Sequence, residues 1–230
     1  MLQTSRVQAI TLDLDDTLWP IWPTIERAEH VLHAWLAEHA PMTAALFANP
    51  AALREIRNHV AEQRPEFKHD LSAVRRESIR LALHRAGEDP LLAEAAFDTF
   101  FAARQQVDLF DDARPALEFL AQRFPLVSLS NGNADLERVG IGRYFRAAVS
   151  AREFGVGKPD PRIFLAAAGA IDVQPEHVLH VGDDATLDVV GALNAGMQAA
   201  WLNRADHHWP HEQQPDVTVR DLNQLCALLA

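Results

Sequence analysis

The sequence contains one cysteine, one tyrosine and only two lysines among its 230 residues. A single cysteine, Cys226, excludes an intrachain disulfide and favours a reducing compartment such as the cytosol. Cys226 lies among leucines, so we expect its thiol to fill the core rather than to react. No apolar run approaches the roughly 18 residues needed to span a bilayer. Asp13 also comes too early for a secretory leader. We therefore predict a cytoplasmic protein with no membrane partner.

Positive charge is scarce as well. Lysine and arginine together number 21 against 32 acidic residues, which gives a net charge of -11. A general nucleic-acid-binding protein needs a basic face, so we expect no nucleic-acid partner. An acidic protein that binds phosphate needs a metal ion or a few well-placed cations. The setting of the two lysines, Lys68 and Lys158, is therefore informative.

Short apolar runs alternate with helical patterns along most of the chain, which is typical of a parallel sheet with helices on both faces. We predict an α/β fold with a Rossmann-like, doubly wound parallel sheet, whose ligand site lies beyond the carboxyl ends of the strands. The expected strands are residues 7–12, 126–129, 147–149, 178–181, 199–202 and, more weakly, 217–219, and the helical patterns between them cover 114–123, 161–170 and 186–195.

One long interval interrupts this alternation. Between residues 19 and 106 we find helical periodicity but no convincing strand, and Asn49-Pro50 and Gly87 to Pro90 punctuate the helices. We predict an all-helical cap domain at 19–106, inserted into a Rossmann-like core formed by 1–18 and 107–230. The expected cap helices cover residues 25–36, 51–61, 71–86 and 91–103.

Three carboxylates, Asp13, Asp15 and Asp16, stand where the first expected strand ends. A carboxylate moved out of water without a partner costs several kcal/mol, so the cluster indicates a cation or a reacting phosphate. Asp13 and Asp15 would share one side of an extended chain and could divide nucleophilic and acid/base roles. The alternative is an acidic turn that caps the next helix.

Two further segments carry groups able to bind an anion. Ser130 and Asn131 can donate hydrogen bonds to an oxyanion, and Gly132 permits close backbone approach. Lys158 stands between Gly157 and Pro159 directly before an expected helix, which would aim its ammonium group. Taken singly, the first segment is also typical of a plain turn, and the lysine of a solvated surface group.

A second acidic cluster, Asp183, Asp184 and Asp188, follows the expected strand at 178–181. Neighbouring parallel strands lie only about 5 Å apart, so two such clusters could flank one hard cation. Helix capping by Asp183 or Asp184 is the alternative.

Together these segments resemble the four signatures of the haloacid dehalogenase superfamily of aspartate-nucleophile phosphohydrolases, in the same order. They are Asp13-Leu14-Asp15-Asp16-Thr17, Ser130-Asn131, Lys158-Pro159-Asp160, and Gly182-Asp183-Asp184 with Asp188. The resemblance implies a mobile helical cap and an enzyme that hydrolyses a small-molecule phosphate ester.

The resemblance also implies roles for individual residues. Asp13 would attack phosphorus, and Asp15 would protonate the leaving alkoxide and then activate water. The cofactor would be Mg²⁺, held by the Asp13 carboxylate, the Asp15 carbonyl and Asp183. Ser130 and Lys158 would neutralise the phosphoryl oxygens, with Thr17, Asn131 and Gly132 as further substrate-binding residues. Asp184 and Asp188 would orient Lys158 or metal-bound water, or ligate the metal directly.

Dehalogenases of this superfamily lack the second aspartate, so Asp15 favours a phosphatase. A phosphomutase or a broad-specificity sugar phosphatase uses the same core and stays open. A phosphoacceptor signalling domain is less favoured because the helical insert follows the first acidic strand directly, and an inert interaction protein is disfavoured because every reactive group is present. We expect a monomer or a homodimer.

The finer pattern is closest to a bacterial subgroup that dephosphorylates flavin mononucleotide (FMN) and its ribitylaminouracil phosphate precursor. This likeness depends on residues 13–19, 130–134, 180–184 and 196–199. Trp19 and Trp22 could offer flat faces to an aromatic substrate or could pack at the boundary of the insert.

Charged and imidazole groups elsewhere give weaker signals. Four cap cations, Arg64, Lys68, Arg75 and Arg76, could reach a substrate, although such side chains are usually only solvated. The histidines at 207, 208 and 211 are expected in an exposed loop with adventitious metal binding or none.

Overall fold

The computed structural model describes the backbone of residues 1–230 and the side chains of residues 1–49 and 52–230. The chain forms two compact units. Unit 1 comprises Met1–Pro20, Asp108–Gly132 and Leu136–Ala230, and unit 2 comprises Ile21–Val107 together with Asn133–Asp135.

Unit 1 contains a six-stranded, all-parallel sheet in the order β3-β2-β1-β4-β5-β6. The predicted fold class and all six expected strands are confirmed. The strands are β1 (Ala9–Leu12), β2 (Leu126–Ser130), β3 (Ala147–Ser150), β4 (Val178–Gly182), β5 (Gln198–Leu202) and β6 (Val217–Val219). Every residue of β1, β2 and β4 is buried, which explains why these strands are mostly apolar.

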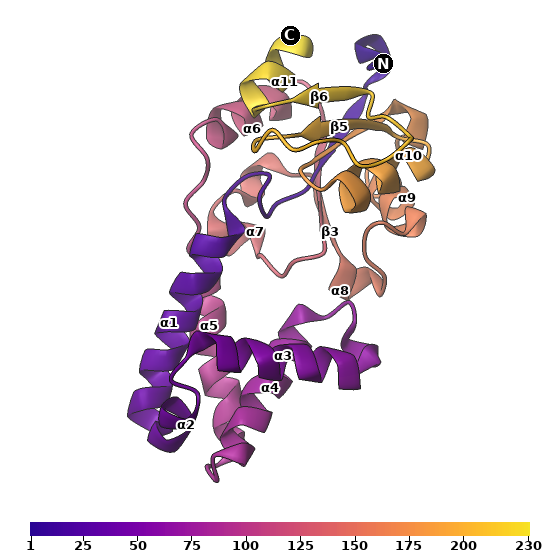
Figure 1. Ribbon diagram of the computed structural model, residues 1–230. Coiled ribbons are helices and arrows are strands. Elements are labelled where there is room, and N and C mark those ends of the chain that lie inside the picture. The colour runs from indigo at the N-terminus through magenta and orange to yellow at the C-terminus, as the bar shows by residue number, and fades with distance from the viewer. The chain divides into compact units, whose positions relative to one another are not determined.

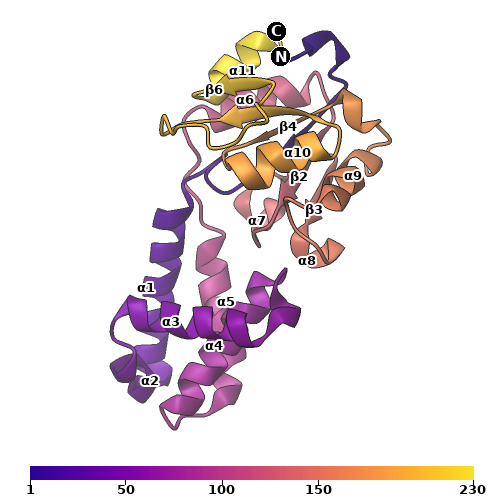
Figure 2. The same ribbon diagram turned by 45° about the vertical axis from the view of Figure 1, so that its right-hand side comes forward.

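Helices cover both faces of this sheet, with α9 and α10 on one face and α6 and α11 on the other (Figures 1 and 2). Ile163 and Phe164 of α9 pack with Val127 and Leu129 of β2 in one buried apolar cluster. The helices of unit 1 are α6 (Ala113–Ala121), α7 (Leu136–Val139), α8 (Ala151–Phe154), α9 (Pro161–Gly169), α10 (Gly191–Asn194) and α11 (Leu222–Leu228). Short 3₁₀ turns are η1 (Thr4–Arg6), η4 (Gly142–Tyr144) and η5 (Pro175–His177), and η6 (Ala185–Val190) is a π-helical turn.

The helix expected at 186–195 therefore forms as two pieces, η6 and α10. The widened turn of η6 follows β4 directly, and its cap is the Asp184 side chain, which accepts hydrogen bonds from the Thr186 and Leu187 amides at 2.8 and 2.7 Å. Single π-turns are frequent at functional sites, and this one carries Asp188.

Unit 2 is all-helical. Its core consists of α1, α2, α4 and α5, whose apolar faces meet around Leu32, Leu36, Leu83 and Phe97. The elements are α1 (Ile21–His39), α2 (Pro41–Leu46), α3 (Pro50–Gln63), η2 (Pro65–Phe67), α4 (Leu71–Arg85), η3 (Pro90–Leu92) and α5 (Ala93–Arg104). Figure 1 shows α1 beside α5 and α3 crossing α4. The short helix α2 has no counterpart among the expected helices.

Candidate active site

The central strand β1 and its neighbours β2 and β4 place the candidate residues at one edge of the sheet. Asp13 follows β1, Ser130 ends β2, and Asp183 follows β4. Because β1 pairs with β2 on one side and with β4 on the other, their carboxyl ends are adjacent. The chain crosses from one side of β1 to the other here, which is the usual position of a ligand site in such sheets.

Lys158 links two of the acidic groups. Its Nζ atom lies 2.5 Å from Oδ1 of Asp13 and 2.5 Å from Oδ1 of Asp188, and its side chain is only 3% exposed. These carboxylates together with burial set its charge state: burial opposes ionisation, but Asp13 and Asp188 outweigh it and raise the pKa of Lys158. The lysine is therefore a fixed positive charge beside Asp13.

Asn131 holds the backbone of Lys158 in place. Its Nδ2 donates to the Lys158 carbonyl at 2.9 Å, and its Oδ1 accepts from the Lys158 amide at 2.8 Å. A Cβ atom on Gly157 would lie 2.6 Å from this Oδ1, so the glycine before the lysine is required for the approach. Both functional groups of Asn131 are engaged with the Lys158 backbone, so its side chain positions Lys158.

Asp188 is surrounded by donors. Besides Lys158, it accepts from the Asp184 amide at 2.9 Å and lies 3.2 Å from Nε2 of His180. Burial opposes its ionisation, but the charge of Lys158 and the contact with His180 outweigh burial and lower the pKa of Asp188. Gly182 permits this arrangement, because a Cβ atom there would clash with the Asp188 carboxylate.

Among the described residues, one group of carboxylates could hold a metal ion: Asp13, Asp183 and Asp188 offer oxygens within 4.8 Å of one another. Burial and the neighbouring acids raise the pKa of Asp183 to about 8. Burial also raises the pKa of Asp13 to about 7, against the opposing effect of Lys158. Acids crowded in this way bind a cation favourably, and an all-oxygen donor set suits a hard divalent ion such as Mg²⁺.

Three other predicted site residues, Thr17, Ser130 and Asp184, form hydrogen bonds of their own near this cluster. Thr17 donates from Oγ1 to Oδ1 of Asp183 at 3.3 Å. The hydroxyl of Ser130 accepts from the Gly132 amide at 2.9 Å, so this turn is closed by its own hydrogen bond. Asp184 caps η6 with its carboxylate, so this aspartate fits the capping alternative rather than metal ligation.

The two tryptophans differ in setting. Trp19 is fully buried and donates its indole N–H to Oδ1 of Asp15 at 2.8 Å. Its ring therefore offers no open face to a substrate, and the indole instead fixes the Asp15 carboxylate. Trp22 is 57% exposed at the start of α1 and belongs to unit 2.

Sequence reasoning missed two polar residues inside the sheet. His180 of β4 and Thr11 of β1 occupy paired positions, and the histidine Nδ1 lies 2.8 Å from the threonine Oγ1. Burial lowers the pKa of His180, against the opposing effect of Asp188. Two polar residues at matching positions in otherwise apolar strands are a signal that pairing the strands in advance would have revealed.

The late histidines and Cys226 lie outside this cluster. His207 and His208 are exposed, and His211 contacts Oγ1 of Thr186 at 2.8 Å. Burial raises the pKa of Cys226 to about 11, so its thiol stays protonated. None of the described helices is long and apolar enough to cross a membrane.

The comparisons with known proteins agree with this geometry. A family model described as haloacid dehalogenase-like hydrolase matches residues 7–196. The chain belongs to this family of hydrolases, as the sequence predicts.

Individual relatives differ in their stated activity. The chain is 34% identical to the 5-amino-6-(5-phospho-D-ribitylamino)uracil phosphatase YigB of Escherichia coli, over 97% of both chains. It is 36% identical to the phosphoserine phosphatase of Thermus thermophilus, over 64% of this chain and 61% of the relative. The crystal structure of a 2-haloacid dehalogenase from Pseudomonas syringae has a TM-score of 0.90 and 40% identity, covering 97% of this chain and 98% of the other.

Proposed function

We propose that this protein is a Mg²⁺-dependent phosphatase that hydrolyses small phosphate monoesters through an aspartyl phosphate on Asp13. The observation that carries the proposal is Asp15, a carboxylate two residues after the nucleophile and fixed by the Trp19 indole at 2.8 Å. An alkoxide leaving group needs a proton, and a positioned carboxyl group supplies one. A halide leaves without a proton, so a dehalogenase has no use for this group.

The reaction runs in two steps. A carboxylate oxygen of Asp13 attacks phosphorus, the bond from phosphorus to the ester oxygen breaks, and Asp15 transfers a proton to that oxygen. Asp15 then takes a proton from a water molecule that attacks the aspartyl phosphate, which releases inorganic phosphate and restores Asp13.

Cationic and polar groups lower the barrier to both steps. Lys158 Nζ, 2.5 Å from Asp13 Oδ1, keeps a positive charge beside the transferred phosphoryl group. Asp13, Asp183 and the carbonyl of Asp15 would hold Mg²⁺, which supplies further neutralisation of the phosphoryl oxygens when bound. Asp188 acts through Lys158, because its carboxylate oxygens already accept from Lys158 and the Asp184 amide.

For the substrate, we propose ribitylaminouracil phosphate or FMN. The Escherichia coli relative named for the first of these aligns over 97% of both chains. A sugar phosphate or a mutase reaction is the alternative within the same core chemistry. The pathway would then be riboflavin biosynthesis, in the cytoplasm.

A second candidate, dehalogenation, is kept because of the Pseudomonas syringae structure. The two reactions are separated by assaying the purified protein for phosphate release from p-nitrophenyl phosphate with MgCl₂, and for chloride release from 2-chloropropionate. Repeated turnover of the phosphate ester supports the proposal. Chloride release without phosphate release would replace it with the dehalogenase assignment.

A further inference from the structure

The end of β5 carries a tryptophan that contacts the loop after β4. Trp201 pairs in register with Gly182, the last residue of β4. This pairing places the indole beside the next residue, Asp183, and the indole N–H donates to the Asp183 carbonyl oxygen at 2.7 Å. Asp183 is one of the carboxylates able to hold a metal ion. The indole therefore fixes the backbone of a candidate metal ligand without touching its carboxylate.

The Trp201 ring is itself held by a chain of aromatic contacts. It is 4% exposed, and the ring of Trp209 packs edge-on against it with the centroids 5.0 Å apart. Trp209 contacts the ring of His211 in the same way at 5.4 Å, and Nε2 of His211 lies 2.8 Å from Oγ1 of Thr186. These side chains thus contact the segment after β4 at two points, the Asp183 carbonyl and the Thr186 hydroxyl.

Arg204, two residues after β5, contacts the loop that follows β1. Its Nη2 donates to the Thr17 carbonyl oxygen at 3.1 Å. The same nitrogen lies 3.0 Å from Oδ1 of Asp112, and the Cζ atom lies 4.1 Å from the centroid of the Phe110 ring. The ion pair and the stacking orient the guanidinium, whose rigid fork of donors can hold an acid and a carbonyl together.

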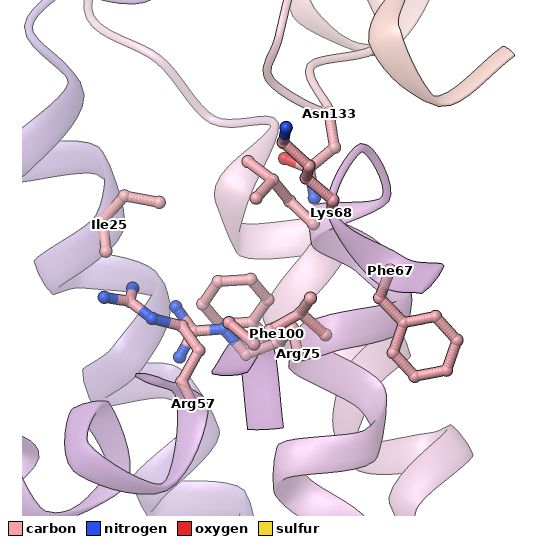
Figure 3. Close-up of a pocket in the computed structure, with 10 residues that line it drawn as sticks. Ile25, Arg57, Phe67, Lys68, Arg75, Phe100 and Asn133 are labelled. Atoms are coloured by element: carbon pink, nitrogen blue, oxygen red, sulfur yellow. The ribbon is translucent and has the colours of Figure 1, made fainter. Parts of the chain in front are cut away.

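An arginine of unit 2 is stacked and paired in a similar way. Arg75 lines a pocket among the helices of that unit and lies 4.2 Å from the centroid of the Phe100 ring (Figure 3). Its ion pair is with Glu29 of the same unit, at 3.4 Å. Stacking and an ion pair are therefore a way in which both units bury an arginine. The bond that gives Arg204 a further role is the one to the Thr17 carbonyl.

The two loops that these side chains contact are also joined to each other. Oγ1 of Thr17 donates to Oδ1 of Asp183 at 3.3 Å. The carbonyl groups that accept from Arg204 and Trp201 belong to these same two residues. Both partners of the hydrogen bond are thus fixed by side chains from the end of β5. The spacing between the loops that carry Asp13 and Asp183 therefore depends on that segment.

We propose that Trp201 and Arg204 are positioning residues, which set the spacing of the Asp13 and Asp183 carboxylates for a divalent metal ion. The inference rests on the metal site of the proposed function and adds two residues that cannot ligate the metal, because indole and guanidinium groups only donate hydrogen bonds. Removing a group that orients a metal ligand typically weakens metal binding about 10- to 100-fold.

Trp201→Phe tests the indole N–H, with Trp209→Phe as the matched control. Both substitutions keep an aromatic ring and remove one N–H donor, but the Trp209 indole donates to the Gln213 carbonyl at 3.2 Å. Binding is measured with Mn²⁺, which suits carboxylate ligands as Mg²⁺ does, by the loss of the EPR signal of the free ion. Trp201→Phe should weaken Mn²⁺ binding about tenfold, and Trp209→Phe should leave it unchanged.

Arg204→Met tests the second contact, with Arg220→Met as its control. The side chain of Arg220 is 72% exposed and lies 3.5 Å from Asp206. Arg204→Met should weaken Mn²⁺ binding about tenfold, and Arg220→Met should not change it. Urea unfolding without metal shows whether each variant is folded in the binding assay. If Arg204→Met does not fold, the comparison of the two tryptophan variants decides the question.

The outcomes separate this inference from the phosphatase assignment, which is judged on the wild type alone by its turnover of p-nitrophenyl phosphate. Equal Mn²⁺ affinities in Trp201→Phe and Trp209→Phe would overturn the positioning role and leave the phosphatase assignment intact. A wild type that hydrolyses no ester but binds Mn²⁺ more tightly than Trp201→Phe would refute the phosphatase assignment and support the positioning role. A wild type that binds no Mn²⁺ would overturn the positioning role, whatever its turnover.

Discussion

Nε2 of His180 lies 3.2 Å from Oδ1 of Asp188, and both side chains are almost completely buried. Since Asp188 also holds Lys158, the imidazole helps to position the lysine beside Asp13. We expect His180→Leu to destabilise the protein by about 1–3 kcal/mol at pH 7.5, because a buried carboxylate loses a partner.

The pH dependence of this loss has a definite sign. Burial lowers the pKa of His180 in the folded state, so the unfolded chain takes up the proton first as the pH falls below about 6.5. On acidification the wild type therefore loses the contribution of His180 to its free energy of unfolding. The His180→Leu variant lacks this contribution at every pH. Urea unfolding at pH 7.5 and 5.5 should show a smaller difference between the two proteins at the lower pH. A difference that grows on acidification would contradict a buried neutral histidine.

Asp13→Asn tests the nucleophile. The amide keeps the size of the side chain but cannot form the acyl phosphate, so we expect kcat for p-nitrophenyl phosphate to fall at least about a thousandfold. The control is Asp98→Asn on the exposed surface of α5, which should retain full activity. Hydrolysis at the wild-type rate in the Asp13 variant would rule out the aspartyl phosphate.

Mg²⁺ should stabilise the protein more at alkaline than at acid pH. The pKa of Asp183 is raised to about 8 by burial and by neighbouring acids, so the metal-free folded state keeps a proton that the unfolded chain loses. The metal-free protein therefore loses stability as the pH rises from about 4 towards 8. Mg²⁺ binds the ionised carboxylates. The increase in Tm on adding about 5 mM MgCl₂ should therefore be larger at pH 8.5 than at pH 6.

Asp183→Asn provides the control for this measurement, because the variant lacks both the elevated pKa and one ligand. Its Tm should respond to MgCl₂ much less at either pH. A wild-type response that shrinks between pH 6 and 8.5 would argue against metal binding by these carboxylates.

Gly182→Ala tests the approach of Asp188 to the end of β4. The added methyl group would collide with the Asp188 carboxylate, and such overpacking costs about 1–3 kcal/mol. Gly169→Ala is the matched control, because a Cβ at Gly169, the last residue of α9, has no neighbour within 4 Å. We expect urea unfolding to show a loss for the first variant and no loss for the second. Equal stabilities would mean that the contact with Asp188 relaxes freely.

Trp19→Phe tests the anchoring of Asp15. Phenylalanine retains an aromatic ring in the buried site but removes the N–H donor that lies 2.8 Å from Asp15. We expect kcat for an alkyl phosphate to fall about tenfold, and kcat for p-nitrophenyl phosphate to fall less, since p-nitrophenolate leaves with little help from an acid. Equal losses on the two esters would show that the indole affects something other than proton transfer.

Much of the fold could be predicted because buried parallel strands leave a direct trace in the sequence. β1, β2 and β4 are buried throughout their lengths and mostly apolar, and a polar residue, Asp13, Asn131 or Asp183, follows each of them directly. The family assignment was confirmed as well, because it depends on short motifs with fixed order. The helix α2, six residues long with Pro41 at its start, was missed because one and a half turns are too short to show periodicity.

The site was less predictable in its details, because local sequence does not reveal which partners a side chain acquires in space. Both polar groups of Asn131 form hydrogen bonds with the backbone of Lys158, 27 residues further along the chain. Trp19 was expected to face a substrate or to pack, and the structure buries it.

The strand order has a consequence for how this protein is made. β1 pairs with β4, so Thr11 meets His180, 169 positions later, and Asp13 meets Lys158 across 145 positions. Contacts of such long range form slowly, because a long loop must close before they are made. During translation the surroundings of Asp13 are therefore incomplete until β4 has left the ribosome. We expect chains that terminate before β4 to lack the assembled site.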